Sequence, residues 1–473
     1  MQVTSKSFVA NAKKGLADAN LQSSLARLST GFPIARLAAI DRMPEFEQLR
    51  DDAVAIKDHT LANLDAYLER YEEKVIESGG HVHWAADGAQ ARDIVLQICR
   101  DAGARTVTKG KSMITEEAGI NEHLEANGIE PIETDLGEYI IQLRNEPPSH
   151  IIAPAIHLSK EQVAETFVTE HTDFPAERDL SDPRTLLEEA RAILRRKFIA
   201  ADVGITGANM LIAETGTSVI VTNEGNGDLT QTLPKTHIVV ASIEKVLPTL
   251  EDATTILRVL ARSATGQEMA VYNTFSTGPR RPDDLDGPEN YHVVILDNGR
   301  SDMLGGEFND MLRCIKCSAC INHCPVYKAV GGHAYGWCYS GPMGAVLVPG
   351  LQGLAEAHDL PQASSFCGRC EDVCPVRIPL PRMLRAWRTK SYEAGLGSKT
   401  SRAGLGVWAY FARRPALYRP LMRVGVAVLA ALGSLRGRGR FSVLPLAGGW
   451  TASRDLPVPE GKTFVEQWKR GKR

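Results

Sequence analysis

The sequence predicts an α/β domain followed by an α-helical, cysteine-rich module and a basic C-terminal region. Strand-like and helix-like segments alternate over residues 79–300, and eight of the nine cysteines lie between Cys314 and Cys374. Residues 376–473 contain 20 Lys and Arg against 4 Asp and Glu, so the net charge of −3 divides into +16 in this tail and −19 elsewhere. A chain of 473 residues has room for several domains. We expect four segments, at 1–78, 79–300, 301–390 and 391–473.

The first segment, residues 1–78, is expected to be helical. Between residues 44 and 78 apolar side chains recur at the interval of an amphipathic helix, and the pattern closes at Gly79 and Gly80. The positions are Phe46, Leu49, Ala53, Ile56, Leu64, Tyr67, Leu68, Tyr71 and Val75. This pattern fits one long helix or two.

The α/β segment begins with elements of alternating type. We expect strands at 81–84 and 106–108, helices at 88–102 and 115–127, and short strands around Ile132 and at 151–152. In its second half Pro183 opens a helix that reaches Phe198, because proline is favoured in a first turn. Further strands are expected at 209–213, 217–222, 238–242 and 292–296, with a hairpin near Gly216, a helix at 250–262 and a loop at 280–288. This alternation is typical of a parallel sheet.

The cysteine spacing predicts the cofactor. Cys314-x2-Cys317-x2-Cys320-x3-Cys324-Pro325 is followed by Cys367-x2-Cys370-x3-Cys374-Pro375. The bacterial ferredoxin run has this form, and its last cysteine ligates the other of two iron–sulfur clusters. Cys314, Cys317, Cys320 and Cys374 would therefore hold cluster 1, while Cys324, Cys367 and Cys370 would hold cluster 2.

The second run lacks one cysteine, because Ser364 stands where the first would be. Cys338 lies outside both runs and is a candidate for the eighth ligand. Without it, cluster 2 is a 3Fe–4S cluster or a 4Fe–4S cluster with a non-cysteine ligand. Zinc is disfavoured because its structural sites do not require a third cysteine in each run. Cys99 lies in an apolar stretch and is interpreted as a buried hydrophobic residue.

Motifs in the α/β segment do not identify a catalytic residue. Glu214 and Glu224 lie near glycine-rich turns, where a small acid or a nucleotide could bind at the carboxyl ends of the strands. The pairs His81/His83 and His150/His157 are within reach of a shared metal ion, although most such histidines are surface or hydrogen-bonded core residues.

The basic tail offers a contact for an acidic partner or an anionic membrane face. No nucleic-acid-reading module accompanies the charge, so nucleic acid is not expected as a partner. The apolar stretch at 424–432 falls short of the roughly 20 residues that cross a bilayer. A membrane span is therefore not expected, and the segment is either a docking or interfacial helix or a short buried helix under a solvated basic surface. No apolar signal segment is seen at the start, so we expect a cytoplasmic protein, with peripheral contact at the inner face of the membrane as one alternative.

Several long stretches resemble the iron–sulfur B subunit of the bacterial lactate-utilisation system. They are 111–117 (KSMITEE), 133–143 (ETDLGEYIIQL), 148–157 (PSHIIAPAIH), 331–336 (GGHAYG) and 341–347 (GPMGAVL). The resemblance implies a Rossmann-like lactate-utilisation domain akin to CoA transferases and sugar isomerases, then a ferredoxin-type module with two 4Fe–4S clusters and a basic C-terminal domain. It also implies that the seven motif cysteines are ligands, a set that does not include Cys338.

This resemblance implies an electron-transfer subunit that works in the oxidation of L-lactate to pyruvate, with lactate-utilisation A and C subunits as partners. The clusters accept electrons singly, and the protein places and tunes them. An alternative is a catalytic subunit of a 2-hydroxy-acid dehydrogenase whose α/β domain binds the substrate or a nucleotide. A third alternative is a scaffold whose clusters are structural or redox-sensing.

Overall fold

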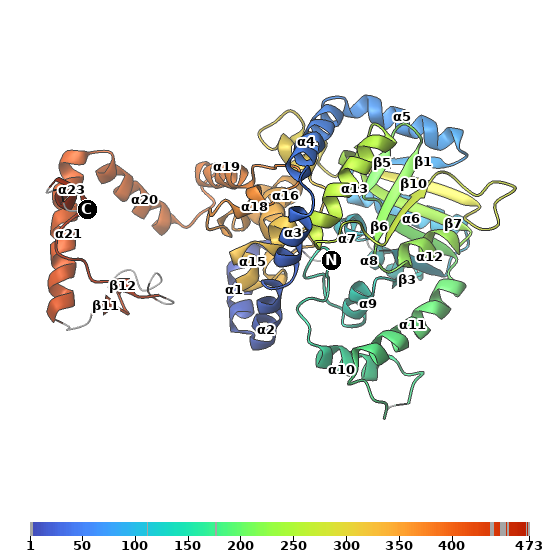
Figure 1. The fold of residues 1–473 in the computed structure, drawn as a ribbon, viewed down its shortest axis with the longest axis horizontal. Coiled ribbons are helices and arrows are strands. Elements are labelled where there is room, and N and C mark those ends of the chain that lie inside the picture. Colours follow the sequence, from blue (N-terminus) through green and yellow to red (C-terminus); the bar gives the residue numbers. More distant parts are fainter. Residues whose placement is uncertain are drawn as a thin grey trace. The chain divides into compact units, whose positions relative to one another are not determined.

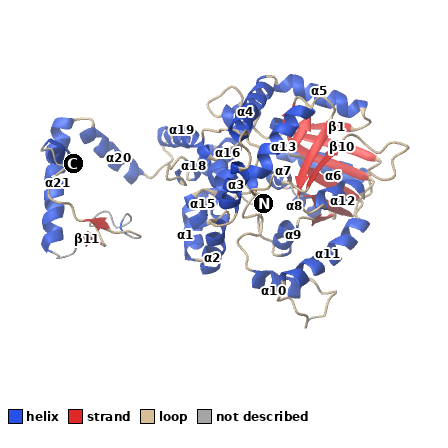
Figure 2. Ribbon diagram, viewed as in Figure 1, coloured by secondary structure: helices blue, strands red, loops and turns tan. Residues whose placement is uncertain are grey.

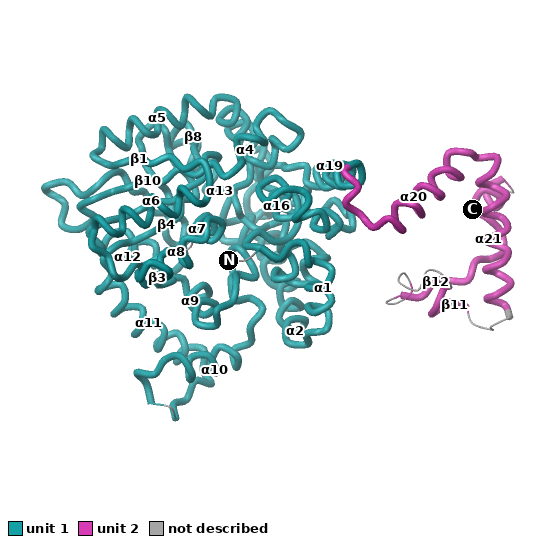
Figure 3. The backbone as a smooth tube through the Cα atoms, turned by 180° about the vertical axis from the view of Figure 1, so that it is seen from behind, with its two compact units in different colours: residues 1–393 teal, residues 394–473 magenta. Residues whose placement is uncertain are grey.

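A computed structural model describes residues 3–110, 112–175, 177–435, 439–444, 451, 454–469 and 471. The contacts divide the chain into a first unit, residues 1–393, and a second unit, residues 394–473 (Figure 3). The predicted division of residues 1–390 into three domains stays a prediction. Lys111, which belongs to one of the stretches that carry the resemblance, lies outside the described residues, as do Arg436, Arg438, Arg470, Lys472 and Arg473 of the basic tail.

The first unit contains a six-stranded parallel sheet in the order β1-β10-β7-β4-β2-β3 (Figure 1). The strands are β1 His81–Ala85, β2 Thr106–Gly110, β3 Glu130–Glu133, β4 Val203–Gly207, β7 Thr236–Ser242 and β10 Asn290–Leu296. The chain runs outward from β2 to β3, then crosses back to β4 on the other side of β2 and continues through β7 to β10. The predicted α/β class is confirmed, and this reversal places a topological switch between β2 and β4.

Helices line both faces of this sheet (Figure 2). Apolar side chains of α6 Gly88–Asp101, α7 Met113–Ala118 and α8 Ile120–Ala126 pack on one face, and those of α5 Leu64–Glu77 pack on the other. A single helix was expected at 115–127. Two helices form instead because Gly119 adopts φ +71°, a left-handed conformation that ends α7.

The strands expected at 209–213 and 217–222 pair as predicted but belong to a second sheet. β5 Met210–Ile212 and β6 Thr217–Thr222 are antiparallel, and they join β8 Val246–Leu247 and β9 Tyr272–Ser276 in the order β8-β5-β6-β9. The strand expected at 151–152 is absent from the described structure. Ile151 and Ile152 lie in a bend, and their side chains line a cavity instead of joining a sheet.

The N-terminal segment is helical, as predicted. Its helices are α1 Phe8–Ala17, α2 Ala19–Leu28, α3 Phe32–Asp41, α4 Phe46–Ala62 and the α5 already described. The pattern at 44–78 thus forms two helices, which meet at Asn63. The remaining helices of the α/β part are α9 Leu136–Leu143, α10 Lys160–Glu170, α11 Pro183–Ala200, α12 Asn226–Thr232 and α13 Leu250–Ala264.

The cysteine-rich module is built from short helices. They are α14 Ala319–Asn322, α15 Pro325–Val330, α16 Gly341–Gln352, α17 Leu354–Ala357, α18 Arg369–Asp372 and α19 Leu380–Glu393. Its core is continuous with the N-terminal helices, because Phe8, Leu25 and Phe46 belong to the same buried cluster as Tyr327 and Tyr335. The N-terminal helices therefore form part of the packing around the cysteines.

The second unit consists mainly of α20 Lys399–Ala412 and α21 Pro415–Leu435, with α23 Phe464–Lys469 and the strand pair β11 Arg440–Phe441 and β12 Leu456–Pro457. The expectation that its apolar segment is too short for a membrane span was wrong. Residues 415–434 form a 20-residue helical stretch of mean hydropathy 1.3, long and apolar enough by length and composition to cross a membrane. The helix extends beyond the predicted stretch at 424–432, because it also includes Arg419, Pro420 and Arg423.

Candidate metal centre

Four of the predicted ligands surround one cavity. Cys314, Cys317, Cys320 and Cys374 line it together with Ile315, Ile321, Met343, Val376, Ile378 and Leu380. Thiolate sulfurs are the usual protein ligands of iron–sulfur clusters, and an apolar shell limits access of water. The donor set and its surroundings therefore fit an iron–sulfur cluster at this position.

The backbone between these cysteines is bent by two residues in the left-handed region. Lys316 has φ +58° and Ser318 has φ +62°, although neither is a glycine. Such conformations cost about 1–2 kcal/mol each, and they persist only where the surrounding structure holds them. They curve the loop so that Cys314, Cys317 and Cys320 line the same space.

Cys324, Cys367 and Cys370 form a second group, because their thiols interact electrostatically with one another. Cys324 caps α15, and its Sγ accepts a hydrogen bond of 3.5 Å from the backbone N–H of Tyr327. Cys370 is buried in α18, whereas Cys367 is exposed. An interaction between Cys320 and Cys370 connects the two groups, which therefore lie next to each other.

Burial makes these thiols hard to ionise without a metal. Desolvation and neighbouring cysteines raise the pKa of Cys370 to about 12, and desolvation raises the pKa of Cys374 to about 11. Metal binding requires thiolates, so the charge of the iron has to replace the lost solvation. We expect the thiols to be protonated when the clusters are missing.

Two buried arginines from the N-terminal helices hold the segment that carries Cys374. The Arg50 side chain donates hydrogen bonds of 2.8 Å to the carbonyl oxygens of Asp372 and Cys374, and Arg36 donates one of 3.2 Å to that of Val373. Arg36 also interacts electrostatically with Cys317. These residues fix the segment of the last ligand, and their positive charge would favour the reduced form of a cluster bound there.

Cys338 is placed differently from the other seven. It is buried, and its principal electrostatic neighbours are Glu117, Glu116, Lys316 and Arg300, none of which is a cysteine. Its role as an eighth ligand stays a prediction that this packing does not favour. Ser364 stands before Cys367, and its Oγ accepts a hydrogen bond of 3.1 Å from the backbone N–H of Phe366.

We predict that Cys338→Ser leaves both clusters in place, because the cysteine groups form without this thiol. Iron and sulfide analysis and low-temperature EPR of the anaerobically purified variant check the prediction. Loss of one EPR signal, with the other unchanged, would identify Cys338 as a ligand after all.

The predicted histidine pairs make other contacts. His83 Nε2 lies 3.1 Å from His292 Nδ1, His150 lies 2.9 Å from Asn322 Oδ1, and His157 lies 2.7 Å from Glu146 Oε2. Over the residues that the structure describes, no three His, Cys, Asp or Glu side chains meet as one metal ion would require. The histidines therefore do not assemble a mononuclear site.

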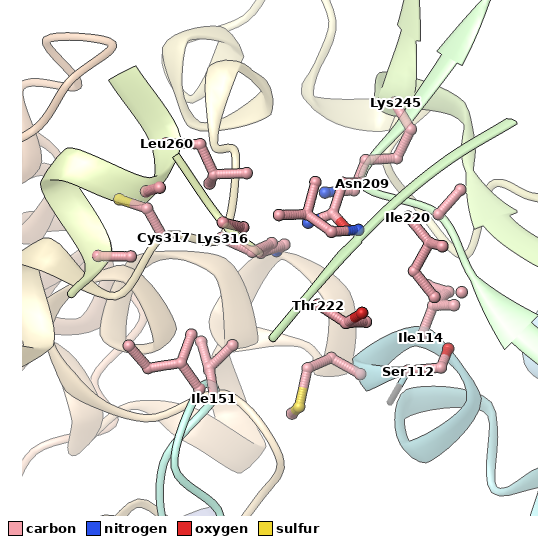
Figure 4. A pocket seen from close by; sticks show the side chains of 18 of the residues that line it. Ser112, Ile114, Ile151, Asn209, Ile220, Thr222, Lys245, Leu260, Lys316 and Cys317 are labelled. Atoms are coloured by element: carbon pink, nitrogen blue, oxygen red, sulfur yellow. The ribbon is translucent and has the colours of Figure 1, made fainter. Parts of the chain in front are cut away.

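Of the two predicted carboxylates, only Glu224 lines a cavity at the carboxyl ends of the strands. Glu214 instead accepts a hydrogen bond from the backbone N–H of Leu250 at the start of α13. The cavity measures about 190 Å³ and lies beyond β2, β4 and β7 (Figure 4). It reaches Cys317 of the first cysteine group. The sequence analysis missed its lysines, Lys245 and Lys316, although Lys316 lies inside the first cysteine run.

A buried ion network lies behind this cavity and connects the sheet to the cysteine-rich module. Arg300 donates hydrogen bonds of 2.8 and 2.6 Å to the two carboxylate oxygens of Glu117, and its Nε lies 3.0 Å from Glu244 Oε2. Tyr339 of the module donates a 2.6 Å hydrogen bond to Glu117. Burial alone would raise the pKa of Glu244, but Arg300 and the nearby lysines bring it to about 2. Both carboxylates are therefore ionised at neutral pH.

Comparison with known proteins agrees with this arrangement. Residues 68–296 match the LUD domain family, and residues 310–378 match the 4Fe-4S dicluster domain family. The fold and the site thus define an iron–sulfur protein in which a parallel α/β domain precedes a module for two iron–sulfur clusters.

The relatives span the whole chain. It is 40% identical to the uncharacterized electron transport protein YkgF of Escherichia coli, over 99% of this chain and 98% of the relative. It is 40% identical to lactate utilization protein B of Bacillus licheniformis, over 98% and 96%, and 41% identical to that of Geobacillus thermodenitrificans, over 100% and 98%. The chain belongs to the lactate utilization protein B family.

A crystal structure of a DUF162 family protein from Deinococcus radiodurans aligns with 49% of this chain and 98% of its own, at 14% identity and a TM-score of 0.28. That likeness is too distant to carry an argument.

Proposed function

We propose that this protein is the electron-transfer subunit of an assembly that oxidises L-lactate to pyruvate. The observation that carries the proposal is the adjacency of two cysteine groups, because α14, which contains Cys320, packs against α18, which contains Cys370. When bound, the clusters supply one-electron redox centres. Two neighbouring centres suit a two-electron donor, because the pair of electrons can be divided between them. The printed names of the relatives, lactate utilization protein B and electron transport protein, support this role.

The ligand assignment follows from the two groups. Cys314, Cys317, Cys320 and Cys374 would hold a 4Fe–4S cluster with four thiolates. Cys324, Cys367 and Cys370 supply three thiolates for the second cluster. If Cys338 is not its fourth ligand, the second cluster is either a 3Fe–4S cluster or a 4Fe–4S cluster with a non-cysteine ligand. The parallel order of the sheet is consistent with a Rossmann-like domain akin to CoA transferases and sugar isomerases.

The relay role predicts that L-lactate will not reduce the clusters of the purified chain by itself. Cluster reduction should appear when the lactate-utilisation A and C subunits are added, because the proposed relay role assigns the oxidation of lactate itself to those subunits. Anaerobic absorption spectroscopy of the clusters, with dithionite as the control for reducibility, measures this. Reduction by L-lactate without the partners would contradict the relay role and favour the catalytic alternative.

One structural feature supports the catalytic alternative. A cavity lies at the topological switch of the sheet, the usual ligand position in such folds, and Cys317 belongs to its wall. A substrate bound there would lie beside the first cluster. The reduction experiment above separates the two roles.

We also propose that the second unit contacts the inner face of the cytoplasmic membrane peripherally. α21 presents exposed Leu421, Val424 and Val428, and it carries Arg419 and Arg423. Apolar side chains enter the interfacial region of a bilayer, while each nearby basic residue contributes about 1 kcal/mol at an anionic surface.

The membrane contact predicts that the full chain sediments with phosphatidylglycerol vesicles and remains in solution with phosphatidylcholine vesicles. Exchange of both α21 arginines, Arg419→Gln and Arg423→Gln, should weaken binding, whereas exchange of the exposed Lys6 of the first unit should not. Alkaline carbonate should release the bound protein. Retention after carbonate would indicate a membrane-spanning helix instead, and equal binding to both vesicle types would overturn the electrostatic contribution.

A further inference from the structure

The cavity beside Cys317 is built from the two parts of the first unit. Ser112, Gly207 and Ser242 follow or end strands β2, β4 and β7, while Lys316 and Cys317 come from the first cysteine loop. Its place between the carboxyl ends of β2 and β4 is where open parallel sheets bind their ligands. Gly207 at the end of β4 and Ser112 after β2 lie close together, because a Cβ added to Gly207 would be 2.8 Å from Ser112 Oγ.

Two cations line this cavity, and neither makes a direct ion pair within the described residues. Among the described residues, neither Lys245 nor Lys316 has a hydrogen-bonding partner or a carboxylate within ion-pair distance, and Lys316 rests over the Tyr339 ring at 4.3 Å. The two lysines repel each other electrostatically. The acidic group closest in sequence, Glu244, interacts electrostatically with both lysines, but its carboxylate lies 3.0 Å from Arg300 Nε and not against either lysine. Unpaired charges in a desolvated position are costly, and an anion placed between them would remove that cost.

Neutral hydrogen-bond donors are present in the same wall. Asn209 uses its Oδ1 to accept a 3.0 Å hydrogen bond from the backbone N–H of Val221, which orients its NH2 group as a donor. Ser112 Oγ accepts from the backbone N–H of Thr115 at 3.4 Å, so its own hydroxyl hydrogen can also be donated. Figure 4 shows Asn209, Lys245 and Lys316 around one space, with Ser112 and Thr222 at its other side. Glu224 also lines the cavity, and it is exposed to solvent and accepts a hydrogen bond from the backbone N–H of Asn223.

The rest of the wall is apolar. Ile151, Ile152, Ile220 and Leu260 contribute aliphatic surface to it. A ligand that fits both parts carries an anionic group at one end and a short carbon skeleton at the other. A volume of about 190 Å³ suits a small molecule and excludes a polymer.

The geometry points to a binding site for a small organic acid, whose carboxylate lies between Lys245 and Lys316 with Asn209 as a further donor and whose carbon skeleton contacts Ile151, Ile220 and Leu260. The bound acid is adjacent to Cys317 and therefore to cluster 1. This site goes beyond electron relay, and it can fail while the relay role stands.

The test is a calorimetric titration of the anaerobically purified full chain with its clusters in place. L-Lactate and pyruvate are the acidic probes, methyl lactate is the uncharged analogue, and inorganic phosphate is the competing anion. At least one acid should bind, methyl lactate should not, and acid binding should shift the EPR signal of cluster 1.

Lys245→Met is the decisive variant, because Lys316 lies between two ligands in a left-handed conformation and its exchange would also act on the cluster loop. We expect Lys245→Met to weaken acid binding by roughly tenfold or more and Lys245→Arg to retain most of it. The exposed Lys235→Met is the matched control and should bind like the parent. Unchanged iron content and an unchanged dithionite-reduced spectrum show that each variant is folded.

Three results would overturn the site: no binding of either acid to the intact protein, equal binding of acid by Lys245→Met and the parent, or binding of phosphate but not of the acids. Each is distinct from failure of the relay role, which is measured by cluster reduction in the presence of the partner subunits.

Discussion

Cys374→Ser is expected to remove the first cluster and to leave the second. Although Cys374 lies only four residues beyond Cys370, its side chain lines the cavity of Cys314, Cys317 and Cys320. The variant should lose roughly half or more of its iron and acid-labile sulfide, together with one of the two EPR signals. The complementary variant Cys324→Ser should lose the other signal, because Cys324 interacts with Cys367 and Cys370.

Cys99→Ala is the matched control. Cys99 is also fully buried, but it lies in α6 and packs in the core between this helix and the sheet. Its iron content and both EPR signals should remain those of the parent. If Cys374→Ser and Cys370→Ser lose the same signal, the crossed assignment of ligands is wrong.

Arg300→Met is expected to lower the free energy of unfolding by about 3–5 kcal/mol. The guanidinium is 1% exposed and is the cation shared by two buried carboxylates, Glu117 and Glu244. Its removal takes away the one cation that pairs directly with both carboxylates and leaves two negative charges in a desolvated position. Anaerobic urea unfolding followed by circular dichroism measures the loss.

Two comparisons make this second prediction specific. Arg196→Met removes an arginine that is 60% exposed and pairs with Asp173, and it should cost no more than about 1 kcal/mol. Neutralising the carboxylates as well, in Arg300→Met with Glu117→Gln and Glu244→Gln, should restore part of the lost stability, because the uncompensated charges are then gone. A triple variant less stable than Arg300→Met would show that packing, and not charge, is the main role of Arg300.

The parts of the fold that were predictable are those in which local pattern and tertiary environment agree. The strands at 81–84 and 106–108 lie between clear helices, the strand at 292–296 follows a loop rich in Pro, Asp and Gly, and all three occupy the parallel sheet. The cysteine runs were equally predictable, because the spacing of cluster ligands is a local property of the sequence. The break at Gly119 was missed, since a glycine inside a helical pattern is often tolerated.

What could not be predicted depends on contacts between distant segments. Ile151 and Ile152 are β-branched residues of the type favoured in strands, but their side chains line a cavity instead. The hairpin at 209–222 could not be assigned to its own sheet, because its partner β9 lies some fifty residues further along the chain. In the same way, no local pattern connects Lys245 to Lys316.

The hold of Arg50 on the Cys374 carbonyl has a consequence for maturation of the protein. The two residues are 324 positions apart, so the contact forms only after nearly the whole first unit has been synthesised. Contacts of such separation form against a large loop-closure entropy and come late in folding. Iron and sulfide delivered before that stage would meet three cysteines of the first site and not the fourth. We therefore expect that removal of the N-terminal helices lowers the iron and acid-labile sulfide content of a chain whose cysteines are all still present.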